Sequence, residues 1–148
     1  MIQEAIQRLD YLCRIIPPLL QQEDEAAFSL PRTPGKWSKK QIMGHLIDSA
    51  TNNHQRFVRA QFEEVPKITY NQDQWNAFNF YERIALGQIL AMWEIYNRQL
   101  LELIKNIPAQ NLLRTCDTGG PAPHTLEFLI RDYVDHLEHH LREVVQYS

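Results

Sequence analysis

Residues 38–62 read SKKQIMGHLIDSATNNHQRFVRAQF, and this stretch decides the fold. It opens with a capping box, because the Ser38 hydroxyl can accept the backbone N–H of Gln41 while the Gln41 side chain reaches back to Ser38. Residues at helical spacing then cluster on one side: Ile42, Met43, Leu46, Ala50, Phe57 and Gln61. The stretch therefore predicts an amphipathic helix from Ser38 to about Phe62.

Three further segments show the same helical periodicity. We expect these helices over residues 2–16, 86–107 and 125–146. Pro17 and Pro18 should end the first helix, and the Thr125 side chain can cap the last one. No strand alternation lasts more than a few residues. Four amphipathic helices predict an all-α fold, a four-helix bundle, with residues 1–148 as one domain.

The composition argues against several classes of binding partner. Hydrophobic residues make up 44% of the chain, charged residues make up 22%, and the formal net charge of −3 indicates no basic surface for nucleic acid. No apolar run approaches the ~20 residues of a membrane span. The two cysteines, Cys13 and Cys116, lack C-x-x-C spacing, which favours a reducing compartment. We therefore expect a cytoplasmic protein that binds neither nucleic acid nor membrane.

Two histidines of the last predicted helix share one face. A helix turns by about 100° per residue, so His136 and His140 lie at the edge of the apolar arc, whereas His139 points to solvent. Two imidazoles at this spacing can bind one metal ion. They can equally be structural, with His140 bonded to a neighbour in the core and His136 at its boundary.

A polar column runs along the helix that begins at Ser38. His45, Ser49, Asn52 and Arg56 recur at helical spacing beside the apolar arc. This pattern is typical of a helix that lines a cleft, and equally of a solvated flank.

His45 could complete a site with the two histidines of the last helix. Three neutral nitrogen ligands would leave a coordination position for water or substrate, as in catalytic zinc sites. All-nitrogen ligation also suits nickel, iron or cobalt. The carboxylates that could orient these ligands, or be ordinary surface charges, are Asp48, Asp132 and Glu138.

Two blocks resemble the signature of a known family. Residues 37–50 (WSKKQIMGHLIDSA) with 53–57 (NHQRF), and residues 132–141 (DYVDHLEHHL), are similar to the DinB-like superfamily and especially its YfiT branch. The resemblance implies a four-helix bundle in up-down-down-up order and a homodimer. It also implies a divalent metal, zinc, nickel or iron, held by His45, His136 and His140.

The resemblance leaves the reaction open, because one fold carries several chemistries. Some members transfer a low-molecular-weight thiol such as bacillithiol or mycothiol to an electrophile, and others are labelled metal-dependent hydrolases. For a thiol S-transferase, Arg56 could bind a carboxylate of the thiol, and Tyr70 and Trp75 could form an apolar wall. For a hydrolase of a small molecule, Asp48 is the first candidate for the base. A third hypothesis is a non-catalytic, metal-stabilised dimer or binding module that uses the aromatic residues of 70–81.

Overall fold

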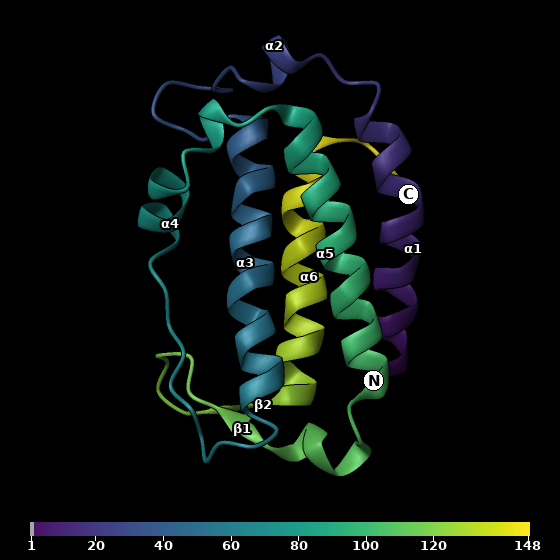
Figure 1. The fold of residues 1–148 in the computed structure, drawn as a ribbon, viewed down its shortest axis with the longest axis vertical. Helices are drawn as coiled ribbons and strands as arrows, with labels where there is room; N and C mark the ends of the chain where they lie inside the picture. The colour runs from purple at the N-terminus through teal and green to yellow at the C-terminus, as the bar shows by residue number, and fades with distance from the viewer. Residues whose placement is uncertain (1) are drawn as a thin grey trace.

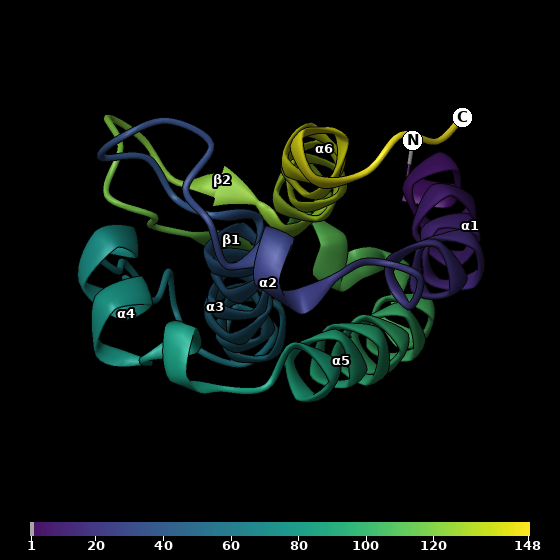
Figure 2. The same cartoon turned by 90° about the horizontal axis from the view of Figure 1, so that it is seen from above.

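Four long helices make up most of the computed structural model, which describes residues 2–148. They are α1 (Ile2–Leu20), α3 (Lys39–Arg59), α5 (Leu86–Asn106) and α6 (Leu126–Val144). Figure 2 shows these helices around a common interior, with the shorter helix α4 outside α3. The predicted all-α four-helix bundle is confirmed.

The four helices run up, down, down and up in chain order (Figure 1). Helices α3 and α5 point the same way because the chain between them returns along the outside of α3. This return segment, residues 60–85, contains α4 (Gln72–Phe78) and the 3₁₀ helix η1 (Tyr81–Arg83). The order is the one that the family resemblance implies.

Short elements close the two ends of the bundle. Helix α2 (Glu25–Phe28) covers the end where α3 begins (Figure 1). At the opposite end, the 3₁₀ helix η2 (Ala109–Leu113) leads into β1 (Thr115–Cys116), which pairs antiparallel with β2 (His124–Thr125). Strands of two residues agree with the absence of lasting strand alternation in the sequence.

Helix α3 begins where the capping box predicts. The Ser38 hydroxyl accepts the Gln41 N–H at 3.1 Å, and the Gln41 side chain accepts the Ser38 N–H at 2.8 Å. The helix ends at Arg59, three residues before the expected Phe62. Arg114 explains the earlier end, because its guanidinium binds the turn carbonyls of Ala60 at 2.7 Å and Glu63 at 3.1 Å.

Helix α1 continues to Leu20, so the prediction that Pro17 and Pro18 end it was wrong. A proline inside a helix lacks the N–H that would bond to the carbonyl four residues earlier. For Pro17 that acceptor is the carbonyl of Cys13, and Arg98 of α5 donates to it instead at 3.0 Å. A side chain from a neighbouring helix thus satisfies the carbonyl and lets α1 run one more turn.

The ends of α5 and α6 lie close to the predicted ones. The Thr125 side chain caps α6 by accepting the Phe128 N–H at 3.1 Å, as expected. Helix α6 ends at Val144, two residues short of Gln146. Gln61, which was expected on the apolar side of α3, is half-buried beyond the helix end and donates to the Phe57 carbonyl at 2.9 Å.

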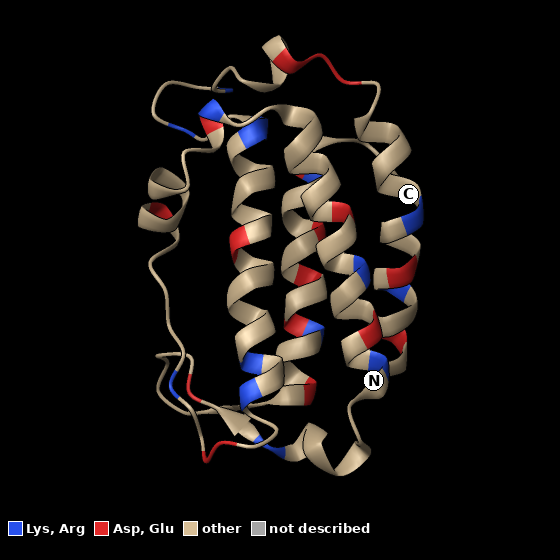
Figure 3. Ribbon diagram, in the orientation of Figure 1, with Lys and Arg blue, Asp and Glu red and all other residues tan. Residues whose placement is uncertain are grey.

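The core is apolar, and its largest fully buried side chains are Trp93, Phe28 and Phe57. Both cysteines are buried and unpaired. Each of the four long helices carries both acidic and basic residues (Figure 3). Across residues 2–148, no helix combines the length and the apolarity that crossing a membrane requires.

The return segment is fixed to α3 by contacts of Tyr81. Its hydroxyl donates to Asp48 Oδ1 at 2.5 Å, and Asn79 Nδ2 donates to the same oxygen at 2.9 Å. The Tyr81 ring can lie against α3 because residue 44 is glycine, and a Cβ atom at that position would overlap the ring. These contacts set the position of α4 beside the first half of α3.

Candidate metal centre

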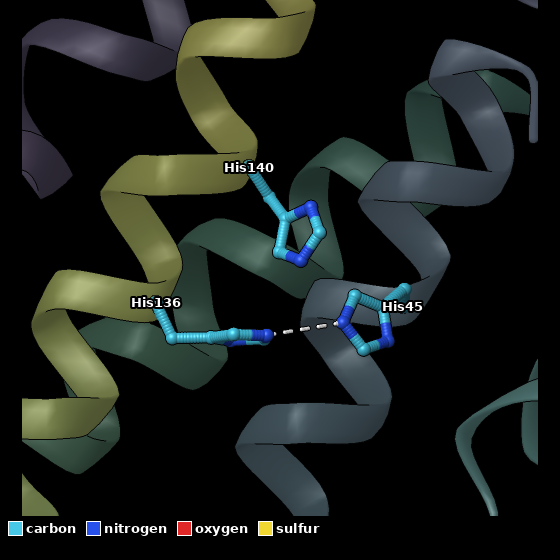
Figure 4. Close-up of side chains that lie close together, drawn as sticks. All are labelled: His45, His136 and His140. Carbon is cyan, nitrogen blue, oxygen red and sulfur yellow. Dashed lines mark hydrogen bonds between the residues drawn. The ribbon is translucent and has the colours of Figure 1, made fainter.

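Three histidines from two helices converge between α3 and α6. His45 projects from α3, and His136 and His140 project from successive turns of α6 (Figure 4). One ligand atom of each lies within 4.8 Å of the others. His45 Nε2 and His136 Nε2 are 3.4 Å apart. The structure therefore brings together the three residues that were predicted as metal ligands.

The arrangement of these nitrogens fits a divalent ion. Two nitrogens at 2.0–2.1 Å from a tetrahedral zinc lie about 3.4 Å apart, which matches the separation of His45 Nε2 and His136 Nε2. Burial, reinforced by the neighbouring histidines, lowers the pKa of His45 to about 3 and of His136 to about 4. Burial also lowers the pKa of His140. All three imidazoles are therefore neutral near pH 7, the form in which a nitrogen can bind a metal.

The fourth histidine of this region lies outside the cluster, as the helical projection predicts. The side chain of His139 is 74% exposed, whereas that of His140 is 19% exposed. The two neighbouring residues therefore differ in environment because they project from different faces of α6.

Glu143 is the carboxylate that contacts the cluster, and the sequence analysis missed it. His140 Nδ1 lies 2.9 Å from Glu143 Oε1, and Arg32 donates to Glu143 Oε2 at 2.7 Å. Although burial alone would raise the pKa of the Glu143 carboxyl, the hydrogen bond from Arg32 and the adjacent His140 lower it. Its position three residues after His140, on the same helix face, was the available signal.

The predicted orienting carboxylates lie elsewhere. Glu138 accepts hydrogen bonds from Arg8 at 2.7 Å and Arg142 at 3.2 Å, and Asp132 is exposed. Asp48 is buried, and its contacts are with Tyr81 and Asn79 of the return segment. Burial raises the pKa of Asp48 to about 6, against the hydrogen bonds from those two residues, which lower it. The structure assigns none of the three to the histidine cluster.

A cleft of about 310 Å³ opens beside the cluster. Its walls are the segment Arg32 to Trp37, the first turn of α4, and His140 with Glu143 of α6. The Trp37 ring packs against the ring of His45, with centroids 5.0 Å apart. A small molecule in this cleft would meet two cationic side chains, Arg32 and Lys36, and two acidic ones, Asp73 and Glu143.

The polar column of α3 is mostly buried, so a solvated flank is excluded for its first members. His45, Ser49 and Asn52 are 1%, 4% and 2% exposed. Arg56 is half-buried at the other end of the column, about 16 Å from His45 along the helix axis. Its guanidinium donates to the carbonyl of Ile68 at 2.9 Å and 3.2 Å.

The predicted aromatic wall lies beside this column. Tyr70 contacts Trp75 edge to face, with centroids 6.0 Å apart. The Arg56 guanidinium lies 5.9 Å from the centre of the Tyr70 ring.

Comparison with known proteins agrees with this architecture. The profile of the family described as "DinB superfamily" matches residues 2–144. A protein of Halalkalibacterium halodurans named "Putative metal-dependent hydrolase" is 27% identical over 146 residues, covering 98% of this chain and 85% of that protein. A Bacillus cereus protein with the same description is 23% identical over 145 residues, covering 97% and 83%.

A solved structure has the same fold. It is YfiT from Bacillus subtilis, described as "a probable metal-dependent hydrolase with an unusual four-helix bundle topology". The two structures align with a TM-score of 0.87 and 23% identity, over 97% of this chain and 83% of that one. In this chain α3 and α5 run in the same direction, which sets its bundle apart from a simple up-and-down one.

Proposed function

Because this chain belongs to the DinB superfamily, we propose that it is a metal-dependent enzyme that acts on a small molecule. His45, His136 and His140 would hold one divalent ion, zinc, nickel or iron. The observation that carries the proposal is the convergence of three neutral imidazoles beside an open cleft. The names of the relatives, which describe metal-dependent hydrolases, support it.

The surrounding residues would prepare this centre for catalysis. A bound divalent ion would supply the positive charge that lowers the pKa of a thiol or a water molecule beside it. Trp37 lines the cleft and packs against the ring of the buried His45. The cleft is lined by two cationic side chains, Arg32 and Lys36, and by two acidic ones, Asp73 and Glu143, so polar groups of either sign could bind there.

The finer proposal is transfer of a low-molecular-weight thiol, such as bacillithiol or mycothiol, to a small electrophile. A thiol nucleophile needs no protein base when a positive charge already lowers its pKa. Two carboxylates near the cluster already have partners, which supports a nucleophile of this kind: Asp48 Oδ1 accepts from Tyr81 and Asn79, and Glu143 pairs with His140 and Arg32. In this proposal Tyr70 and Trp75 form the apolar wall, and Arg56 binds a carboxylate of the thiol.

Hydrolysis is the second candidate, and two observations favour it. The relatives carry the name of hydrolases, and the exposed carboxylate of Asp73 lines the same cleft as His140. Asp73 could serve as the base for an attacking water, a role that the sequence analysis gave to Asp48. Replacement of Asp73 by Asn would then lower hydrolysis and leave thiol transfer unchanged.

One experiment separates these activities. The protein is loaded in turn with Zn²⁺, Ni²⁺ and Fe²⁺ and assayed with a panel of thiols plus a small electrophile, and separately with esters and amides without thiol. Thiol transfer that depends on metal and is lost in His136→Ala supports the first proposal. Hydrolysis alone supports the second. Stoichiometric metal with turnover in neither assay contradicts both and favours the metal-stabilised binding module, for which a homodimer is tested by light scattering.

A further inference from the structure

Residues 31–38 form a compact loop directly before α3. A bridge between Pro31 and Ser38 closes the loop at its base. Within the loop, the Lys36 N–H donates to the Thr33 carbonyl at 3.1 Å. Because Ser38 is also the cap of α3, the loop is tied to the helix that carries His45.

The two sides of this loop reach different histidines of the cluster. On one side, the Trp37 ring packs against His45 of α3. On the other side, Arg32 Nη2 lies 2.7 Å from Glu143 Oε2, and Glu143 Oε1 lies 2.9 Å from His140 Nδ1. The loop therefore contacts His45 of α3 directly, and it reaches His140 of α6 indirectly, through Glu143.

We propose that Glu143 is a positioning residue for His140 and that Arg32 holds Glu143 in place, so that the 31–38 loop orients the metal centre. The proposal rests on the proposed function, because it concerns the same three histidines. An ionised carboxylate only accepts hydrogen bonds. Glu143 therefore assigns the proton of the neutral His140 ring to Nδ1 and leaves the lone pair of Nε2 free for a metal ion.

A second carboxylate on α6 provides a matched control. Glu138 also pairs with an arginine at 2.7 Å, and its side chain is 17% exposed, against 28% for Glu143. Its contacts are with Arg8, Arg142 and Tyr147, on the α1 side of the helix. The two glutamates thus share helix, charge and arginine pairing, and differ in contact with a histidine of the cluster.

Metal affinity tests the role of Glu143. We expect Glu143→Gln and Glu143→Ala to weaken Co²⁺ and Zn²⁺ binding by about 10- to 100-fold, the usual effect of losing a hydrogen-bond partner of a ligand. Glu138→Gln and Glu138→Ala should leave the affinity unchanged. Arg32→Ala should weaken binding less than Glu143→Ala. In the Glu143→Ala background it should add nothing, because Arg32 acts through Glu143.

The ring nitrogens of the metal-free protein give an independent readout. NMR of the wild type should show the neutral His140 ring protonated on Nδ1, and Glu143→Ala should move that proton toward Nε2. A wild-type ring protonated on Nε2, or equal losses of affinity in the Glu143 and Glu138 variants, would overturn the positioning role. A wild-type protein that binds no metal would overturn the proposed function, while the NMR experiment would still decide the role of Glu143.

Discussion

Helices α1 and α3 are similar in length and bury different kinds of side chain. The buried residues of α1 are all apolar: Ala5, Leu9, Leu12, Cys13, Ile16 and Leu20. The buried residues of α3 include polar ones: Lys40, His45, Asp48, Ser49, Asn52 and Asn53. Burying a polar group costs free energy unless it finds a partner. Helix α1 therefore contributes to stability through apolar burial, whereas α3 also buries polar groups that can form a site.

The buried polar atoms that lack a hydrogen-bond partner show the same difference between α1 and α3. Two of the three buried side-chain atoms without a hydrogen-bond partner within residues 2–148 belong to α3, namely His45 Nδ1 and Asp48 Oδ2. Unsatisfied polar groups at this depth are uncommon, and they are typical of functional regions. Changes in α1 should therefore act on stability alone, whereas changes in α3 should act on the site.

The largest effect should come from the core of α1. Leu12 is fully buried, so Leu12→Ala should lower the free energy of unfolding by about 2–5 kcal/mol, through lost burial and the cavity left behind. Chemical denaturation measures the loss. Leu30→Ala is the control, because Leu30 is 66% exposed and its truncation should leave stability nearly unchanged. Loss of metal by the folded Leu12→Ala protein would contradict the separate roles of α1 in stability and α3 in the site.

A smaller effect should come from the close approach of α3 and Tyr81. Gly44→Ala places a Cβ atom in the Tyr81 ring, and overpacking of this kind costs about 1–3 kcal/mol. Gly87→Ala on α5 meets open space and should stabilise the protein slightly, since alanine favours a helix over glycine. Thermal melts of the two variants should shift in opposite directions. A melting temperature of Gly44→Ala at or above that of the wild type would show that Tyr81 does not pack tightly on α3.

The third effect is the pH dependence of the metal-free protein, in which opposing pKa shifts partly cancel. His45 and His136 have folded pKa values of about 3 and about 4, below their ordinary value of 6.5. The unfolded chain therefore binds more protons, so stability falls as the pH drops from about 6.5 toward 4. Asp48, whose pKa is raised to about 6, opposes this trend.

Unfolding curves at a series of pH values measure that slope. His45→Gln should flatten it, because one of the two shifted histidines is removed. His139→Gln is the control and should leave the slope as it is, since the side chain of His139 is 74% exposed. An unchanged slope in His45→Gln would show that burial of the histidine does not destabilise the acid form.

Local sequence patterns predicted most of the bundle. Capping side chains fixed the starts of α3 and α6, because Ser38 and Thr125 make short-range contacts that the sequence itself displays. The end of α1 was mispredicted because the carbonyl that Pro17 leaves free is satisfied by Arg98, which lies 85 residues away in the chain. Such a tertiary contact has no local signature.

In the candidate site, too, local patterns could be predicted from the sequence and tertiary contacts could not. Helical spacing placed His136, His140 and His45 on faces that could meet, and it separated His139 from them. Several contacts around the site come from outside the long helices. Trp37, which packs against His45, and Arg32, which pairs with Glu143, precede α3, and Tyr81, which binds Asp48, follows α4. Periodicity says nothing about where a loop folds back, so neither the Glu143–Arg32 pair nor the Asp48–Tyr81 bond could be predicted from spacing.

Metal stoichiometry of two neighbouring variants tests the central claim most directly. The wild type, His136→Ala and His139→Ala are purified, loaded with Zn²⁺, dialysed and measured by elemental analysis, with circular dichroism to verify folding. The wild type and His139→Ala should retain one ion per chain, and His136→Ala should retain none. Retention by His136→Ala, or loss in His139→Ala, would contradict a metal centre built by the facing sides of α3 and α6.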